Sequence, residues 1–510
     1  MKIQISLCLC LFLSVLGLGQ NSPQQPNIIV FLIDDMGWQD CSLPFHTERT
    51  KWNDLYHTPN LEKLAAQGVK FTHAYAAPVC SPSRVSLMTG MNAIKHKVTN
   101  WTLWKNQSTD GKSATLTPPK WNMNGLSPVP GVENAVYATS LATVLKQHNY
   151  YTIHVGKAHL GAAGTPGSNP LNLGFDVNVA GHAAGAPQSY YGLANFGNKR
   201  GRDSIWGVPG LEKYWGQDVF LSDVLTKEAI AAMDKAKEAR QPFFLHFAHY
   251  AVHAPIMADP RFVQKYYARG MDSTEAKYAS LVEGMDKSLG DVMTYLEQTQ
   301  LAKNSIIIFL SDNGGLSASV RGGIRHEHNT PLRSGKGSAY EGGVRIPFVL
   351  KWPGMVQPGS TNAQNIIIED IFPTVLTMAG IQKPKLVQKI DGQDIFPLIQ
   401  QKSNTNKRFL YWHYPHIWGP KGPALELYSV IRQGHWKLIY FHTDQRFELY
   451  NTEADLGETQ NLFSAQHPVA LKLVKELGRA LKKGRAEMPK EIATQRNVPY
   501  PDDLIKMRAR

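Results

Sequence analysis

Continuous apolar runs recur along the first two thirds of the chain, and turn-forming or charged residues bound each of them. Runs of this kind are typical of strands that are buried on both faces of a parallel sheet. The clearest runs span residues 27–33 and 305–310, and we also expect strands over 69–76, 151–155, 242–249 and 346–352.

Between these runs the apolar positions repeat with the period of an amphipathic helix. The predicted helices cover residues 61–67, 139–148, 219–239, 274–298 and 369–379. Strands that alternate with helices predict an α/β fold, in which helices sandwich a large, mixed, mostly parallel sheet.

The pattern changes near the C-terminus. Residues 428–441 and 447–450 alternate between apolar and polar positions, as antiparallel strands do, and 468–485 reads as a final helix. Asp391-Gly392 opens a linker before this region. We therefore expect a large domain over residues 20–400 and a smaller C-terminal α+β subdomain with an antiparallel sheet over 405–510.

The composition suits a large globular protein that meets polyanions. The 510 residues are 43% hydrophobic, which is ample for an extensive core, and the net charge is +13. A basic surface attracts nucleic acid and sulfated glycans alike. The sequence has no zinc-finger spacing, RNA-binding signature or long basic arm, so we expect no nucleic-acid partner.

Residues 1–19 have the pattern of a signal peptide, with Lys2 before the apolar run Leu7–Leu16 and small residues at the end. No later run is long enough to span a bilayer. We expect an exported protein, periplasmic or extracellular. Only Cys41 and Cys80 would remain after cleavage, which favours the periplasm, although two glycosylation sequons leave a eukaryotic route open.

Polar side chains follow several predicted strands. Asp34-Asp35 follow the first strand and Asp312-Asn313 follow the strand at 305–310, while Lys157, His159 and His253 come shortly after two others. Ligands bind at the carboxyl ends of such strands. The oxygen ligands of the first two pairs favour Ca²⁺ or Mg²⁺ over zinc. Alternatively, one acid of Asp34-Asp35 caps a turn and the other is solvated.

Cys80 directly precedes a segment that reads as the start of a helix. Pro82 suits a first helical turn, Ser81 can cap it, and Arg84 follows about one turn later. A helix N-terminus favours an anion, so this position suits a reactive thiolate or a bound anionic group. A buried cysteine before an ordinary helix explains the same spacing.

The pattern Cys80-x-Pro82-x-Arg84 with Thr89-Gly90 resembles the signature of the type I, formylglycine-dependent sulfatases. Further matches extend over nearly the whole chain after residue 19. They are Asp34-Asp35, Gly156-Lys157-x-His159-x-Gly161, His253-x-Pro255, Ser311-Asp312-Asn313-Gly314 and Gly335-Lys336-Gly337. One departure is Ala158, where many members of the family carry Trp.

The resemblance implies an alkaline-phosphatase-like fold with its catalytic domain in residues 20–400. It implies that a formylglycine-generating or sulfatase-maturating enzyme converts Cys80 to formylglycine (3-oxoalanine). A cation, Ca²⁺ or alternatively Mg²⁺, would be held by Asp34, Asp35, Asp312, Asn313 and residue 80.

The resemblance also implies catalytic roles. Arg84 and Lys157 would stabilise the modified residue, and His159 would hydrogen-bond its hydrated form. His253 would protonate the leaving sugar oxygen, and Lys336 would hold the sulfate.

For the substrate, the resemblance and the basic charge favour an exo-acting carbohydrate sulfatase. We expect it to act on sulfated galactose or N-acetylgalactosamine of mucin or glycosaminoglycan, with His182, Arg325 and Glu327 binding the sugar. One alternative is a phosphodiesterase or phosphonate hydrolase of the same superfamily. Another is a non-catalytic protein that binds sulfated glycans.

Overall fold

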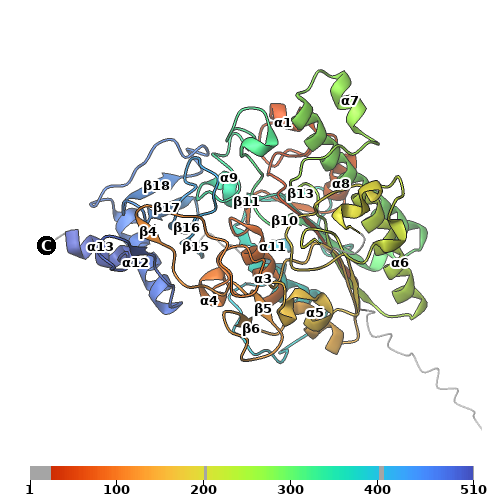
Figure 1. Ribbon diagram of the computed structural model, residues 1–510, viewed down its shortest axis with the longest axis horizontal. Coiled ribbons are helices and arrows are strands. Elements are labelled where there is room, and N and C mark those ends of the chain that lie inside the picture. The colour runs from red at the N-terminus through yellow and green to blue at the C-terminus, as the bar shows by residue number, and fades with distance from the viewer. Residues whose placement is uncertain (1–24, 200–203, 401–406, 509–510) are drawn as a thin grey trace, which may run out of the picture.

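A central eight-stranded sheet organises the computed structural model, which describes residues 25–199, 204–400 and 407–508 (Figure 1). Its strand order is β13-β2-β12-β10-β1-β9-β7-β8. In chain order the strands are β1 (Asn27–Ile33), β2 (Val69–Phe71), β7 (Tyr151–Gly156), β8 (Val177–Val179), β9 (Phe243–Ala248), β10 (Ser305–Ser311), β12 (Phe348–Lys351) and β13 (Ser360–Asn362). The strands from β10 to β8 run parallel, whereas β12 is antiparallel to both of its neighbours, which confirms the predicted mixed sheet.

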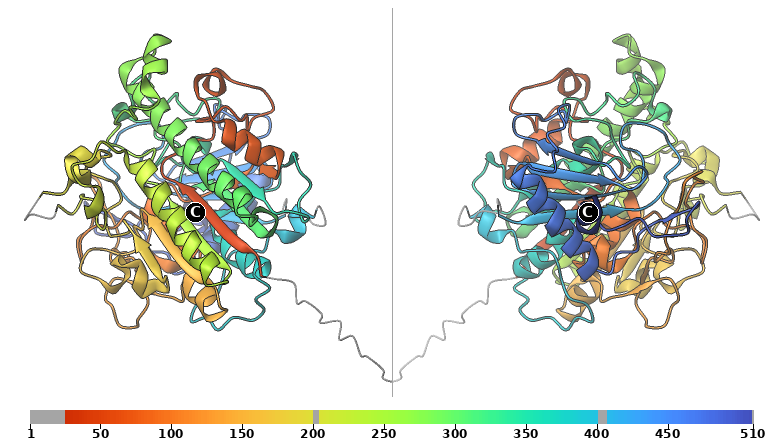
Figure 2. Two further views of the ribbon diagram at one scale, coloured as in Figure 1. Left: turned by 90° about the vertical axis from the view of Figure 1, so that its right-hand side faces the viewer. Right: turned by 90° about the vertical axis from the view of Figure 1, so that its left-hand side faces the viewer.

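The two faces of the sheet explain why its strands read as continuous apolar runs. In β1, Ile29 and Phe31 face one hydrophobic core, and Val30 and Leu32 face the other. Helices cover both faces, as the two side views of Figure 2 show. One layer contains α2 (Pro59–Ala66), α6 (Leu221–Glu238) and α8 (Ser273–Gln298), and the other contains α3 (Cys80–Thr89), α5 (Leu141–Gln147) and α10 (Ile371–Met378).

Two predicted strands are each divided in the structure. Residues 69–76 form β2 and β3 (Ala74–Tyr75), and residues 346–352 form the end of β11 (Arg345–Ile346) and β12. Pro347 separates β11 from β12, because it has no backbone N–H to donate to a ladder. β11 and β3 join β14 (Ile366–Ile367) in a separate three-stranded sheet.

The C-terminal region forms the predicted antiparallel sheet, with four strands in the order β15 (Phe409–Tyr414), β16 (Tyr428–Gln433), β17 (Trp436–Phe441) and β18 (Phe447–Asn451). The sequence pattern did not predict β15. α12 (Pro468–Lys483) packs its apolar side on this sheet. α12 is not the final helix, since α13 (Pro501–Arg508) follows it.

The C-terminal sheet also packs against the backbone that carries the candidate site. Leu410, Val430 and Ile439 share a hydrophobic core with Val79 and Ala339, which lie close to Cys80 and Lys336 in the sequence. This contact braces two segments that approach each other from distant parts of the chain.

The remaining elements are short. They are α1 (Lys51–Leu55), α4 (Ala93–His96), α7 (Val263–Ala268), α9 (Glu341–Val344), α11 (Phe396–Ile399), β4 (Leu116–Thr117), β5 (Leu126–Ser127), β6 (Val136–Tyr137) and β19 (Lys490–Glu491), besides several 3₁₀ turns. Within the described ranges, no helix is both long and apolar enough to cross a bilayer. The predicted signal peptide, residues 1–19, lies outside the described residues.

Candidate active site

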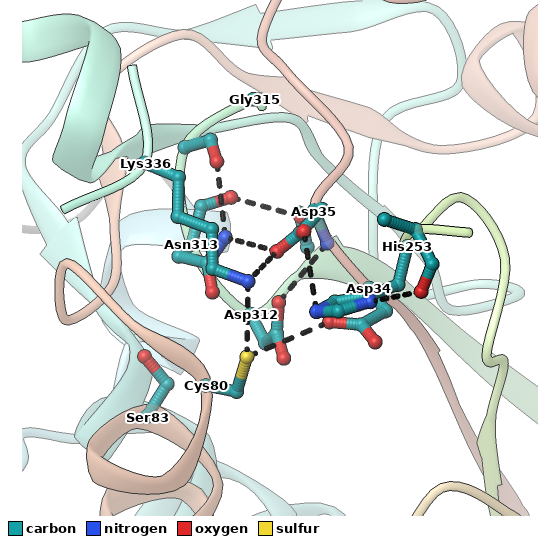
Figure 3. A network of polar contacts seen from close by, with 12 residues as sticks. Asp34, Asp35, Cys80, Ser83, His253, Asp312, Asn313, Gly315 and Lys336 are labelled. Atoms are coloured by element: carbon teal, nitrogen blue, oxygen red, sulfur yellow. Dashed lines mark hydrogen bonds and ion pairs between the residues drawn. The ribbon is translucent and has the colours of Figure 1, made fainter. Parts of the chain in front are cut away.

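Four adjacent parallel strands, β10, β1, β9 and β7, end at the same edge of the central sheet. Asp34-Asp35 follow β1, Lys157 follows β7, Asp312 follows β10, and His253 lies in the turn after β9. The topology therefore brings together side chains that are up to 278 positions apart in the sequence, such as Asp35 and Asn313 (Figure 3).

Cys80 lies at the first position of α3, as the sequence predicted. Its thiol lies 3.7 Å from Asp34 Oδ1, and the ammonium of Lys336 lies 3.3 Å from its sulfur (Figure 3). Burial raises the pKa of Cys80 to about 11, despite Lys157 and Lys336 nearby, so the thiol is protonated at neutral pH.

The prediction that Ser81 caps α3 is wrong. Ser81 lies inside the helix, and its hydroxyl oxygen accepts a hydrogen bond from the backbone N–H of Thr102 at 3.2 Å. The side chain therefore fixes the loop at residues 100–102 against the helix. At the other end, Gly90 has φ +67°, a left-handed conformation that glycine adopts without strain, and terminates the helix.

Three carboxylates and three cations form a buried network beneath Cys80. Its closest pairs are Arg84 with Asp312 at 2.8 Å, Lys157 with Asp34 at 2.6 Å, and Lys336 with Asp35 at 2.5 Å. Each acidic side chain thus lies against a basic one, which offsets part of the cost of burying them.

The two neighbouring carboxyl groups of this network have opposite pKa shifts. Burial raises the pKa of Asp34 to about 8 and outweighs the attraction of Lys157. Burial also acts on Asp35, but Lys336 and the other nearby cations outweigh it and hold the pKa of Asp35 well below its usual range. Of these two neighbouring carboxyl groups, Asp34 is therefore the one whose negative charge is less well compensated by nearby cations.

The oxygen-rich donor set fits a hard divalent cation. Possible ligand atoms of Asp34, Asp35, Cys80 and His253 lie within 4.8 Å of one another. Asn313 donates from Nδ2 to Asp35 at 2.9 Å, and its buried Oδ1 has no hydrogen-bond partner among the described residues. A buried oxygen without a donor is costly, and a cation would satisfy it.

Two histidines border the same space in different environments. His253 is about 20% exposed, and its Nδ1 donates to the carbonyl of Ala254 at 2.6 Å, which leaves Nε2 free, 3.7 Å from Asp35. Burial lowers the pKa of His253 to about 3. His159 is fully buried, and its Nε2 donates to the carbonyl of Thr102 at 2.8 Å, which leaves Nδ1 without a partner in the described chain. Burial holds the pKa of His159 well below its usual value.

A cavity of about 200 Å³ opens above these groups. It is lined by Val79, Cys80, Trp101, His159, Gly185, Ala186, Trp206, His253, Lys336 and Trp418. The lining includes four of the predicted site residues, Cys80, His159, His253 and Lys336. Arg84, Lys157 and the predicted metal ligands other than Cys80 are buried outside the lining. These ligands are Asp34, Asp35, Asp312 and Asn313.

The three residues predicted to bind the sugar are not part of this lining. The backbone carbonyl of His182 accepts a hydrogen bond from the N–H of His159 at 3.1 Å, and Arg325 and Glu327 are exposed. Instead, Trp101, Trp206 and Trp418 form much of the wall. Their only signal in the sequence is the presence of tryptophans in loops rich in glycine, asparagine and proline.

Two protein-family models match this chain. The family model described as Sulfatase matches residues 26–381, and a model described as N-sulphoglucosamine sulphohydrolase, C-terminal, matches residues 335–487. The first match alone extends over more than half of the chain and includes every predicted catalytic and metal-binding position.

Individual relatives extend over nearly the full length. A sulfatase from Formosa agariphila is 31% identical over 96% of this chain and 94% of its own length. The N-acetylgalactosamine-6-sulfatase of Mus musculus is 32% identical over 92% of this chain and 84% of its own length. The crystal structure of Ps i-CgsB superimposes with a TM-score of 0.70 and 26% identity, covering 90% of this chain and 93% of that one. The chain therefore belongs to the sulfatase family and is a sulfuric ester hydrolase.

Proposed function

We propose that this protein is an exo-acting carbohydrate sulfatase that uses a formylglycine made from Cys80 and a divalent cation. The observation that carries the proposal is the position of Cys80. Its sulfur lies at the N-terminus of α3, within 3.3 Å of Lys336 and 3.7 Å of Asp34, at the floor of a cavity that His253 also lines. A sulfate ester bound in this cavity would therefore contact a nucleophile at residue 80, the positive charge of Lys336 and the proton donor His253.

The residues that would hold the cation are Asp34, Asp35, Asp312 and Asn313, together with residue 80. We expect Ca²⁺, with Mg²⁺ as the alternative, because all four side chains offer oxygen atoms. When present, the hydrated aldehyde would supply a nucleophilic hydroxyl and the cation would neutralise negative charge. Arg84 and Lys157 support the site by holding the carboxylates of Asp312 and Asp34 in place.

His253 and Lys336 would act on the leaving group. As the bond between sulfur and the sugar oxygen breaks, negative charge develops on that oxygen, and His253 Nε2 would deliver a proton to it. The neighbouring sulfate anion favours the protonated ring, which opposes the effect of burial on its pKa. Lys336 would stabilise the sulfate oxygens and the same bridging oxygen in the transition state.

His159 would accept a proton at residue 80. Because its Nε2 donates to Thr102, its Nδ1 carries a lone pair and has no partner within the described residues. A base at this point would remove a proton from the modified residue and help to expel sulfate.

The substrate class follows from the relatives and the charge. The relatives include N-acetylgalactosamine-6-sulfatases, and this chain has a net charge of +13. We propose a sulfated galactose or N-acetylgalactosamine at the end of a mucin or glycosaminoglycan chain. His182, Arg325 and Glu327 remain proposed contacts for the sugar hydroxyls, although none of them is in the lining of this cavity.

Maturation and export complete the proposal. Residues 1–19 would direct the chain to the periplasm or the extracellular space. A formylglycine-generating or sulfatase-maturating enzyme would convert Cys80.

Sulfate release from a panel of substrates tests the proposal. Protein produced with a maturating enzyme would be incubated with sulfated mono- and oligosaccharides, an aryl phosphodiester and an aryl phosphonate, with and without chelator. We expect release from a galacto-configured sugar sulfate, lost with chelator and in Cys80→Ala. Faster cleavage of the phosphodiester or phosphonate would overturn the proposal.

A further inference from the structure

Three tryptophans from three separate loops form the walls of the cavity above Cys80. We infer that Trp101, Trp206 and Trp418 are specificity-determining residues, which enclose one sugar ring and stack against its apolar face. The inference rests on the proposed function, because it concerns the sugar ring that carries the sulfate group. It adds aromatic contacts to the proposed contacts of His182, Arg325 and Glu327.

Trp418 is held directly beside the reacting groups. Its indole packs on Gly337, where an added Cβ would lie 2.5 Å from the ring. The centroid of the Trp418 ring lies 5.7 Å from the ammonium nitrogen of Lys336, which is within the range of a cation–π interaction. Since Lys336 also contacts Cys80, the indole borders the position of a sugar whose sulfate lies on the cavity floor.

Trp101 and Trp418 lie on two loops that one carboxylate joins. Asp110 Oδ1 accepts hydrogen bonds from Asn100 at 3.3 Å, from His416 Nδ1 at 2.9 Å and from the backbone N–H of Ile417 at 3.3 Å. These partners lie within two positions of Trp101 or Trp418 in the chain. The two walls are therefore fixed relative to each other, as a site that selects by shape requires.

Trp206 comes from a third loop. Its carbonyl accepts a hydrogen bond from the N–H of Gln188 at 2.7 Å, close to Gly185 and Ala186, which also line the cavity. Gly185 in turn packs against the ring of His159, because an added Cβ would lie 2.4 Å from that ring. The segment from Gly185 to Gln188 thus connects Trp206 with His159.

The arrangement of polar and apolar groups matches a sulfated sugar. Cys80, Lys336 and the two histidines supply the polar part of the lining, while the three tryptophans offer large, partly exposed aromatic faces. The indole N–H of Trp101 is buried without a partner in the described chain. A galacto-configured ring presents C–H groups over one face, which suits stacking on an indole.

The size of the cavity suits a single sugar residue. Its volume of about 200 Å³ is below the range of about 300–1,000 Å³ that is typical of sites for drug-sized ligands. A single hexose sulfate fits this description, whereas an internal residue of a glycan would need openings on both sides.

Turnover and binding measurements on tryptophan variants test the inference. Trp101→Ala, Trp206→Ala and Trp418→Ala would be compared with Trp104→Ala, a matched control whose side chain is 43% exposed on the same loop as Trp101. Each protein would be assayed for sulfate release from galactose 6-sulfate and from propyl sulfate, an ester without a ring. Binding of galactose 6-sulfate would be measured by calorimetry in the Cys80→Ala background, where no turnover occurs.

We expect each wall variant to lower kcat/KM for galactose 6-sulfate by about 2- to 10-fold, in line with the usual strength of aromatic contacts. Propyl sulfate turnover and the Trp104→Ala control should change less than twofold. Equal losses on both esters, or unchanged binding of galactose 6-sulfate in the wall variants, would overturn the inference. If binding of galactose 6-sulfate depends on the tryptophans but no sulfate is released, the result would support the role of the tryptophans and contradict the proposed hydrolysis.

Discussion

The ammonium nitrogen of Lys336 lies 3.3 Å from the sulfur of Cys80, and both side chains are buried. Lys336 reaches this point from a loop 256 positions later in the chain. Its ion pair with Asp35 at 2.5 Å fixes the ammonium in place. A positive charge is thus positioned at the reacting residue before any substrate binds.

Replacing this lysine should lower catalysis. It should also lower stability, because the buried carboxylate of Asp35 loses its closest cation. We expect Lys336→Met to lower kcat for sulfate release by about 100- to 1,000-fold, the usual loss when one group that stabilises transition-state charge is removed. Lys105→Met, on an exposed lysine of the loop that carries Trp101, is the control and should be unchanged. A Lys336→Met protein that is folded and retains more than a tenth of the activity would contradict the role given to Lys336.

The proton donor can be identified from the leaving group. If His253 protonates the departing oxygen, His253→Ala should lower turnover of a sugar sulfate by about 100- to 10,000-fold. Turnover of nitrophenyl sulfate, whose leaving group is stable without a proton, should fall far less. Equal losses on the two esters would show that His253 does not act as the acid. The measurement is kcat/KM for both substrates in the same protein preparations.

Cation binding should stabilise the protein through Asn313. Its Oδ1 is buried and lacks a donor in the described chain, so a bound Ca²⁺ would provide its missing partner. At a calcium concentration 100-fold above Kd, we expect the free energy of unfolding to rise by about 2.7 kcal/mol. In Asn313→Ala the calcium-dependent rise should be smaller, as measured by thermal unfolding with calcium or chelator. An identical rise in both proteins would exclude Asn313 as a ligand.

Glu369 should make stability fall with rising pH. Burial, followed by the nearby Asp370, raises the pKa of Glu369 from 4.5 to about 7. The folded protein therefore binds this proton more tightly than the unfolded chain, and stability falls as the pH rises from about 4.5 to about 7. The full effect is at most about 3 kcal/mol.

Glu369→Gln removes this titration and keeps the oxygen that accepts from Asn92 at 2.8 Å. Urea unfolding at pH 5 and pH 8 should show the variant gaining stability relative to the wild type at the higher pH. If the difference in the free energy of unfolding between the two proteins is the same at both pH values, the pKa of Glu369 is not raised in the folded protein.

The strand ends of the site were predictable because a doubly covered sheet gives its strands a distinctive sequence. Asp34 and Asp312 follow runs that are apolar at every position, and the topology of parallel strands places their ends at one edge. The start of a helix at Cys80 was predictable from Pro82 and from the apolar positions that follow it.

Features that depend on contacts between loops were not predictable. Ser81 has the composition of a cap, but the loop at Thr102 takes its hydroxyl oxygen instead. The strand β15 forms because it pairs with β16, and nothing within its own six residues shows that pairing. The tryptophan walls depend on Asp110 joining two loops more than 300 positions apart, which no local pattern records.

The central claim is that a converted Cys80 hydrolyses sulfate esters. Its most direct test is to produce the protein with and without a maturating enzyme. Mass spectrometry would give the fraction of residue 80 present as formylglycine, and ion chromatography the rate of sulfate release from galactose 6-sulfate. We predict that the rate per mole of protein is proportional to the converted fraction and is zero in Cys80→Ala. Equal release from preparations in which residue 80 is entirely cysteine would contradict the account.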